Sequence, residues 1–261
     1  MTETASRPGR KLGLFAAIAL VMGNMIGSGV FLLPASLAPF GWNAVLAWIV
    51  TTAGTLVLAW VLAALTRARP EARDPAGFVT AAFGELPAFL VNWVYWVSVW
   101  TAVVSIAVAG VSYLSALVPA IQATPLAPAL CAIALVWAMT LINLRGVRAA
   151  GQFQIVTVLL KLLPLLAVIV IAAVLLGGQG TQALHPYAAA EINGTALGGA
   201  AALTLFALLG FECASLAAAR VENPQVNVPR ATMWGTALTG LVYLLVCSAV
   251  ALMLPQDVAA A

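Results

Sequence analysis

Two ionisable residues lie inside long apolar stretches of this 261-residue sequence. Lys161 stands near the middle of Gln154–Leu176, and Glu212 follows Gly210 in a second apolar stretch. A charged side chain at bilayer depth costs at least about 2.5 kcal/mol, so such residues face protein or water and have partners. We therefore expect an ammonium and a carboxylate inside the protein, with Glu212 a candidate for a proton-linked role.

Simpler interpretations of both residues stay open. Lys161 could extend its ammonium to a membrane interface, although its central position argues against this. Glu212 could instead hydrogen-bond a broken helix backbone. A third alternative is a structural Lys161–Glu212 ion pair.

Glycine and polar residues also interrupt two apolar runs. The first run contains Gly23, Asn24, Gly27, Ser28 and Gly29, and the second contains Gly210. Each glycine costs about 1 kcal/mol relative to alanine in a helix interior. Gly23 and Gly27 alone would suit close helix packing, but such a face needs neither Asn24 nor Gly29. We therefore predict a helix break in each run.

Paired broken helices indicate the binding site of a secondary transporter built from inverted repeats. The free N–H groups and positive dipole end of a half-helix suit a carboxylate. Unwound carbonyl oxygens accept hydrogen bonds from an ammonium. An amino acid carries both groups, so it matches such a site.

The composition places these residues in a membrane. Apolar side chains make up 64% of the sequence and charged ones 7%, whereas soluble domains have about 25% charged residues. A spanning helix needs about 20 apolar residues. The sequence predicts seven helices, at 12–36, 41–65, 86–118, 126–143, 153–176, 195–220 and 231–254.

The basic residues predict the orientation of these helices. Ten of the eleven fall on one side: Arg7, Arg10, Lys11, Arg67, Arg69, Arg73, Arg145, Arg148, Arg220 and Arg230. By the positive-inside rule, the amino terminus is cytoplasmic and the carboxyl terminus lies outside. The net charge of +3 thus reflects topology, and we expect no nucleic-acid partner.

Other chemistry has little support in the sequence. Cys131, Cys213 and Cys247 lie in apolar runs without the spacing of a disulfide framework or zinc site. We expect no metal, no cofactor and no enzyme activity, because neither a phosphate-binding loop nor a nucleophile–base pair occurs. His185 lies in the predicted outer loop; a pH-sensing role is conceivable, but a lone loop histidine is more often only solvated.

Three segments resemble the amino acid/polyamine/organocation transporters, and most closely their arginine/agmatine antiporter branch. The segments are Gly23–Pro34, Asn92–Ser115 and Gly210–Ala231, which includes Glu222-Asn223-Pro224. The resemblance covers essentially the whole chain. It implies a five-plus-five inverted-repeat fold of α-helices, with helices 1 and 6 broken.

The resemblance also implies roles for individual residues. The substrate-binding residues would be Ile26, Gly27, Ser28, Gly29, Tyr95, Phe206 and Gly210. Phe206 matches a gating aromatic, although an aromatic in a spanning helix is usually packing. Glu212 matches a carboxylate proposed for proton coupling, and Lys161 resembles the helix 5 lysine of sodium-independent members.

Two residues depart from the pattern of the arginine antiporters. Val103 and Ile106 stand where that branch has pocket contacts, one of them a polar amide. This difference favours a substrate with a less polar side chain than arginine. We therefore expect a small or apolar amino acid, or an amine.

The expected protein is a permease or antiporter of the inner membrane that works by alternating access. Its organisation would be a tail (1–11), a first repeat (12–176), an outer loop (177–194) and the start of a second repeat (195–261). Seven crossings supply only two helices of that second repeat. The alternative is therefore a half-size subunit that needs a missing carboxyl-terminal half or a homodimer.

Overall fold

The structure is a computed structural model. It describes residues 11–27, 29–69, 71–72, 75–184 and 192–254. The predictions for Ser28, His185, Arg7, Arg10 and Arg73 lie outside the described residues. The described part of the chain is helical. Its β-structure is limited to one isolated bridge between Leu12 and Val221.

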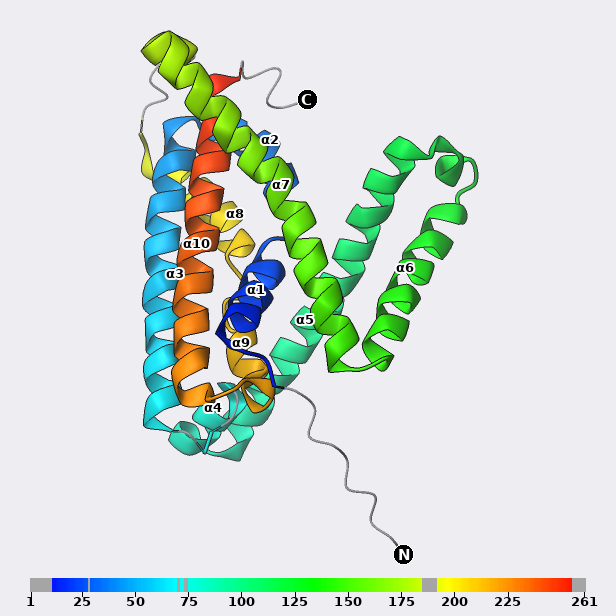
Figure 1. The fold of residues 1–261 in the computed structure, drawn as a ribbon, viewed down its shortest axis with the longest axis vertical. Coiled ribbons are helices and arrows are strands. Elements are labelled where there is room, and N and C mark those ends of the chain that lie inside the picture. Colours follow the sequence, from blue (N-terminus) through cyan, green and yellow to red (C-terminus); the bar gives the residue numbers. More distant parts are fainter. Residues whose placement is uncertain (1–10, 28, 70, 73–74, 185–191, 255–261) are drawn as a thin grey trace, which may run out of the picture.

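Ten α-helices follow one another along the described chain (Figure 1). They are α1 (Leu14–Met25), α2 (Gly29–Leu37), α3 (Trp42–Ala68), α4 (Pro75–Phe83), α5 (Glu85–Leu117), α6 (Ala127–Leu144), α7 (Val147–Gln179), α8 (Gly194–Ala207), α9 (Cys213–Leu216) and α10 (Pro224–Met253). Four 3-10 turns connect them: Ala38–Phe40, Pro119–Gln122, Gly180–Ala183 and Ala218–Arg220.

Five of these helices, α3, α5, α6, α7 and α10, are long and apolar enough to cross a membrane. Helices α1 and α8 are apolar but shorter, with 12 and 14 residues. At about 1.5 Å per residue, the 33 residues of α5 and of α7 exceed the roughly 30 Å hydrocarbon layer. The described chain is therefore an all-α membrane protein.

Helix boundaries differ from the predicted ones mainly at the amino ends. Helix α10 begins at Pro224 rather than at 231, because proline suits the first helical position, where its missing N–H is not needed. Helix α7 begins at Val147 rather than at 153. The short helix α4 was not predicted.

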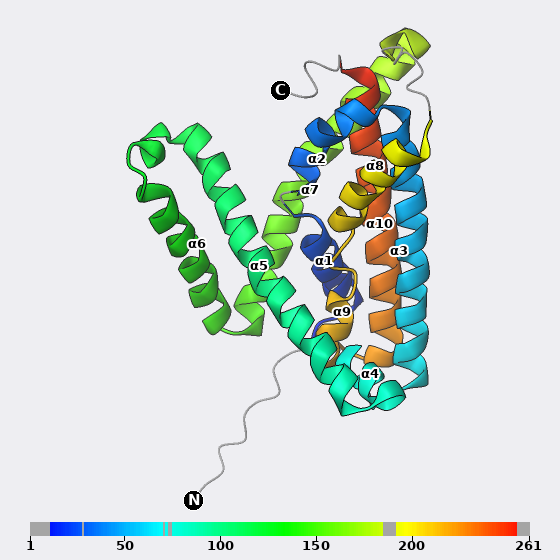
Figure 2. The same ribbon diagram turned by 180° about the vertical axis from the view of Figure 1, so that it is seen from behind.

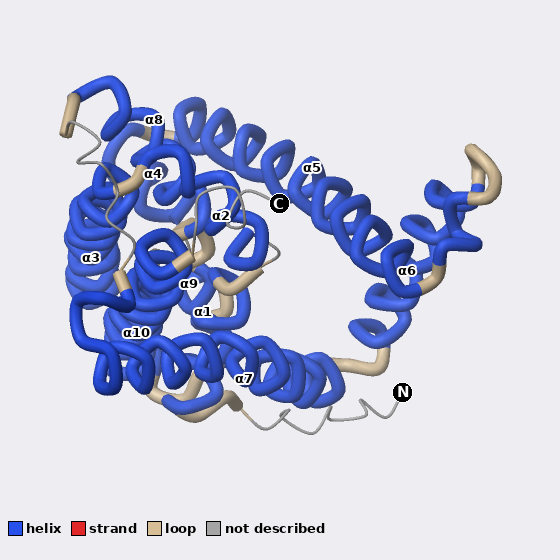
Figure 3. The backbone as a smooth tube through the Cα atoms, turned by 90° about the horizontal axis from the view of Figure 1, so that it is seen from above, coloured by secondary structure: helices blue, strands red, loops and turns tan. Residues whose placement is uncertain are grey.

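The helices form two regions. The packed block comprises α1, α2, α3, α8, α9 and α10, and its fully buried side chains include Trp48, Tyr243, Ile26 and Leu208. The α5–α6 arm stands apart from the block, as two opposite views show (Figures 1 and 2). Seen from above, α7 lies along the block and leads to α6 (Figure 3).

Small residues allow the block to pack closely. A Cβ atom added to Gly235 of α10 would lie 2.6 Å from a methyl carbon of Val21. The rings of Trp48 and Tyr243 join α3 to α10, with centroids 5.1 Å apart. Close approach of these helices fixes the position of α1, on which the candidate site depends.

Candidate functional site

The chain leaves helical geometry between α1 and α2. Helix α1 ends at Met25, and Ile26 follows with φ −75° and ψ 84°. The Gly27 N–H donates to the Met25 carbonyl over 2.9 Å, and α2 begins at Gly29. A Cβ atom on Gly27 would meet no atom within 4 Å, so open space lies beside this break.

Lys161 reaches the break from α7. Its Nζ donates to the Ile26 carbonyl oxygen at 2.8 Å and to the Gly23 carbonyl oxygen at 3.4 Å. The ammonium thus satisfies carbonyl groups that a helix end leaves without intrahelical partners. Lys161 is therefore bound inside the protein, and its ammonium does not extend to an interface.

Gly23 allows α7 to approach α1 this closely. A Cβ atom at Gly23 would overlap the side-chain amide of Gln154 and lie 2.6 Å from a Val158 methyl carbon. Gly23 therefore serves the close packing considered in the sequence analysis. It also brings Lys161 within reach of the break.

Tyr243 holds the same break from α10. Its hydroxyl donates to the Met25 carbonyl oxygen over 2.6 Å, and its side chain is fully buried. The sequence analysis missed this residue, because one tyrosine in an apolar helix carries no signal of its partner. A cation from α7 and a phenol from α10 thus hold the end of α1.

A second irregular segment separates α8 from α9. It runs from Leu208 to Glu212, and Gly210 adopts φ 104°. A Cβ atom on Gly210 would lie 3.1 Å from the Asn24 carbonyl carbon. Only glycine fits this conformation and contact without strain, so this segment touches the last turn of α1, just before the first break, through its backbone.

Glu212 hydrogen-bonds within this second segment. One carboxylate oxygen accepts the Gly210 N–H at 3.1 Å, as the backbone-bonding alternative predicted. The ion pair with Lys161 is not formed; the ion pair seen among the described residues joins Arg69 and Glu71. Lys161 and Glu212 therefore act at different breaks.

The two aromatic candidates differ in their exposure. Tyr95 of α5 is 37% exposed and close enough to Glu212 to interact with it electrostatically. Phe206 near the end of α8 is 72% exposed. Val103 and Ile106 of α5 are also exposed.

The structure thus brings together part of the predicted site. Ile26, Gly27, Lys161, Gly210 and Glu212 lie around the carboxyl end of α1, with Tyr95 close to Glu212. Gly29 begins α2. No group of three or more potential metal ligands occurs among the described residues.

A comparison with protein families assigns the chain. Residues 12–261 match the family described as amino acid permease. The chain belongs to this family. The resemblance to the amino acid/polyamine/organocation transporters is confirmed, and the family and the curated relatives are named as permeases, antiporters and transporters.

Curated relatives lie in the amino acid and polyamine branch. The chain is 34% identical to the cadaverine/lysine antiporter of Escherichia coli (strain K12), over 97% of this chain. It is 32% identical to the putrescine transporter PotE of the same strain over 94% of the chain. Identity to the putrescine transporter PotE of Haemophilus influenzae is 31% over 96% of the chain.

The chain spans little more than half the length of these relatives. The matches cover 56% of the two Escherichia coli proteins and 57% of the Haemophilus protein. Together with the five long apolar helices, they make this chain a multi-pass inner-membrane protein of a transporter family.

Proposed function

We propose that this chain carries the substrate site of a secondary active transporter that works by alternating access. The observation that supports it most is the pair of hydrogen bonds from Lys161 to the carbonyls of Ile26 and Gly23. A lysine that holds a helix break open, beside free space at Gly27, leaves backbone groups available to a ligand.

In this proposal the substrate lies between the α1–α2 break and the segment that precedes α9. The amino end of α2, which begins at Gly29, offers a positive dipole to a carboxylate. Open space at Gly27 admits the substrate. Ser28 and Phe206 keep their proposed roles as carboxylate contact and gating aromatic.

The substrate we propose is an amino acid or amine with an aliphatic chain. The relatives are named for cadaverine, lysine and putrescine, which all carry such a chain. Val103 and Ile106 are exposed on α5, and they would contact its methylene groups. A competition experiment with a labelled substrate distinguishes this substrate from a small apolar amino acid. Unlabelled lysine, cadaverine and putrescine should displace the label, and alanine and leucine should not.

We propose that transport is independent of sodium. The Lys161 ammonium donates hydrogen bonds to two carbonyl oxygens. Carbonyl oxygens are also the ligands that a sodium ion would need. Replacing sodium with a large organic cation should leave uptake unchanged. A requirement for sodium would contradict the proposal.

Proton coupling is assigned to Glu212. Its carboxylate caps the Gly210 N–H at the second break, and Tyr95 lies nearby. Glu212→Gln keeps the hydrogen-bond acceptor but cannot exchange a proton. We expect it to bind substrate and to lose uptake driven by a proton gradient, whereas Glu222→Gln, at an exposed carboxylate, should keep that uptake.

The proposed topology has seven crossings in a five-plus-five arrangement. The first repeat spans 12–176, and the second begins at 195. Helices α3 and α6 end, and α5, α7 and α10 begin, toward the same lower side in Figure 1, which supports one basic, cytoplasmic face. Cysteine labelling from either side of the membrane at Arg145 and Gln122 tests this orientation.

A second candidate function is a subunit that cannot transport alone. The exposed α5–α6 arm favours it. Reconstituting the 261-residue chain by itself decides between the two. Uptake of labelled lysine or putrescine supports a working carrier, and binding without uptake supports a subunit.

The site itself is tested by equilibrium binding, which does not require transport. Labelled lysine or putrescine should bind the wild-type chain and fail to bind Lys161→Ala. Lys11→Ala, at an exposed lysine outside the site, is the matched control. Equal binding by the two variants would remove the main support for the proposal.

A further inference from the structure

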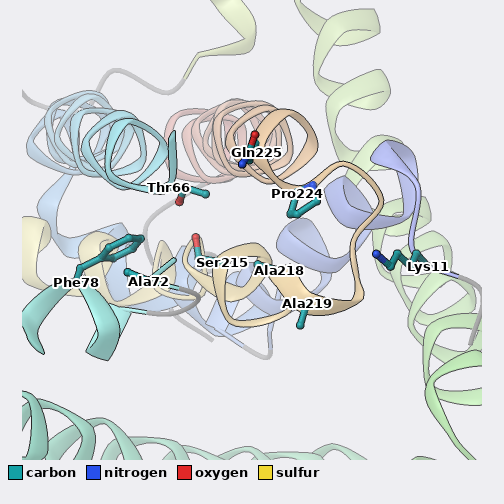
Figure 4. A pocket seen from close by; sticks show the side chains of 9 residues that line it. All are labelled: Lys11, Thr66, Ala72, Phe78, Ser215, Ala218, Ala219, Pro224 and Gln225. Atoms are coloured by element: carbon teal, nitrogen blue, oxygen red, sulfur yellow. The ribbon is translucent and has the colours of Figure 1, made fainter. Parts of the chain in front are cut away.

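We propose that a pocket at the membrane-surface end of the packed block binds a phosphate-type anion. The pocket has a volume of about 300 Å³ and lies where α3 ends and α10 begins (Figure 4). Its lining includes Lys11, Thr66, Phe78, Ser215, Pro224 and Gln225. None of the residues at the two helix breaks lines it, so this would be a second site.

A buried, unpaired hydroxyl points into this pocket. Ser215 is 3% exposed, and its Oγ has no hydrogen-bond partner among the described residues. Figure 4 shows the hydroxyl directed from the α9 segment toward Thr66 and the space below α3 and α10. Because an unsatisfied buried hydroxyl is costly, an oxygen of a bound anion would stabilise it.

The amino end of a long helix faces the same space. Helix α10 has 30 residues, and Asn223 precedes it with φ 43° and no side-chain cap. Pro224 and Gln225 of its first turn line the pocket. A helix amino end carries partial positive charge and binds anions such as phosphate.

Lys11 adds a positively charged side chain to the lining. The Leu12 N–H donates to the Arg220 carbonyl at 2.8 Å, and the Glu222 N–H donates to the Leu12 carbonyl at 2.9 Å. These reciprocal bonds hold the backbone next to Lys11 beside the pocket. No acidic residue belongs to the described lining, and the Glu222 carboxylate lies beside Gly13 instead.

Two sources could supply such an anion. The pocket lies at the ends of α3 and α10, two helices long and apolar enough to cross a membrane, so a phospholipid phosphate could enter it from the membrane surface. Free phosphate could enter from the solvent. Both share the chemistry that a hydroxyl, a helix amino end and an ammonium recognise.

The experiment compares the two sources on the purified chain. Calorimetry measures the binding of inorganic phosphate in detergent, and native mass spectrometry measures retained phosphatidylglycerol after passage through phosphatidylglycerol or phosphatidylcholine nanodiscs. We expect Ser215→Ala to weaken binding about tenfold, or about 1.4 kcal/mol. Ser98→Ala, whose hydroxyl bonds its own helix backbone on the arm, is the matched control.

Gln225→Glu provides a second variant that should fold. Gln225 is exposed in the first turn of α10, where an acidic residue suits the helix dipole, yet its charge would repel an anion. Loss of phosphate binding in both variants supports a free anion, and loss of retained phosphatidylglycerol supports a lipid headgroup. Binding of neither probe by the wild type, or equal binding by all variants, would overturn the proposal.

Discussion

The packed block and the α5–α6 arm are both built from apolar helices, but the helices of the block bury a larger share of their residues inside the protein. In the most apolar segment of α10, 39% of the residues are buried, and in that of α6 none is. Hydropathy therefore does not decide which helices pack together. The difference comes from small residues and from polar groups that pair between helices.

Polar groups behave differently in the two regions. In the block, the hydroxyls of Thr51 and Thr204 lie 3.0 Å apart between α3 and α8, and Tyr243 bonds α1. On the arm, Ser98 and Ser105 each donate to the carbonyl four residues earlier in α5. The arm's hydroxyls thus need no neighbouring helix, so this surface suits either lipid or further helices.

The largest effect should follow from adding a methyl group inside the block. Gly235→Ala would place Cβ 2.6 Å from a Val21 methyl carbon, and overpacking of this kind costs about 1–3 kcal/mol. On the arm, Gly110→Ala meets only a Leu135 methyl carbon at 3.6 Å. We expect a lower melting temperature for the first variant and an equal or higher one for the second.

Those two melting temperatures check the comparison directly. Thermal unfolding in detergent, followed by circular dichroism, measures both variants under one condition. Equal destabilisation by Gly235→Ala and Gly110→Ala would show that the block is no more tightly packed than the arm.

Removing the Tyr243 hydroxyl should have the next largest effect. Tyr243→Phe leaves the buried Met25 carbonyl without this 2.6 Å hydrogen bond, at a cost of about 1–3 kcal/mol. The arm control is Tyr113→Phe, at an exposed tyrosine. Ligand binding should weaken only in Tyr243→Phe, because only that variant loosens the end of α1.

A smaller change is expected for the threonine pair. Thr204→Val removes the buried contact with Thr51, and a single hydrogen bond contributes about 1 kcal/mol. Thr101→Val on the arm removes only bonds within α5, so its melting temperature should shift less. A larger shift for Thr101→Val would mean that the arm packs against helices in the membrane.

Hydropathy and charge were enough to predict the all-α membrane class and the long helices. They could not predict that α5 and α6 stand apart, because apolar residues face lipid as readily as protein. The predicted start of α10 at 231 was wrong, because the helix begins at Pro224 and continues through Pro229 and Arg230. A proline at the first helical position needs no N–H.

In the site, too, features set by neighbouring residues could be predicted from the sequence, whereas contacts between distant residues could not. Gly27 and Gly210 lie in irregular backbone, which glycine signals locally in the sequence, whereas Gly23 lies inside α1 and allows α7 to pack closely. The partner of Lys161 could not be predicted, since its bonds to Gly23 and Ile26 join residues more than a hundred positions apart. Tyr243 was missed for the same reason.

One pair of variants tests the central claim that the substrate lies at the α1–α2 break. At both Gly27 and Gly54 an added Cβ atom meets no atom within 4 Å. We predict that Gly27→Leu abolishes binding of labelled lysine or putrescine, while Gly54→Leu binds as the wild type does. Retained binding by Gly27→Leu, with an unchanged melting temperature, would contradict the account.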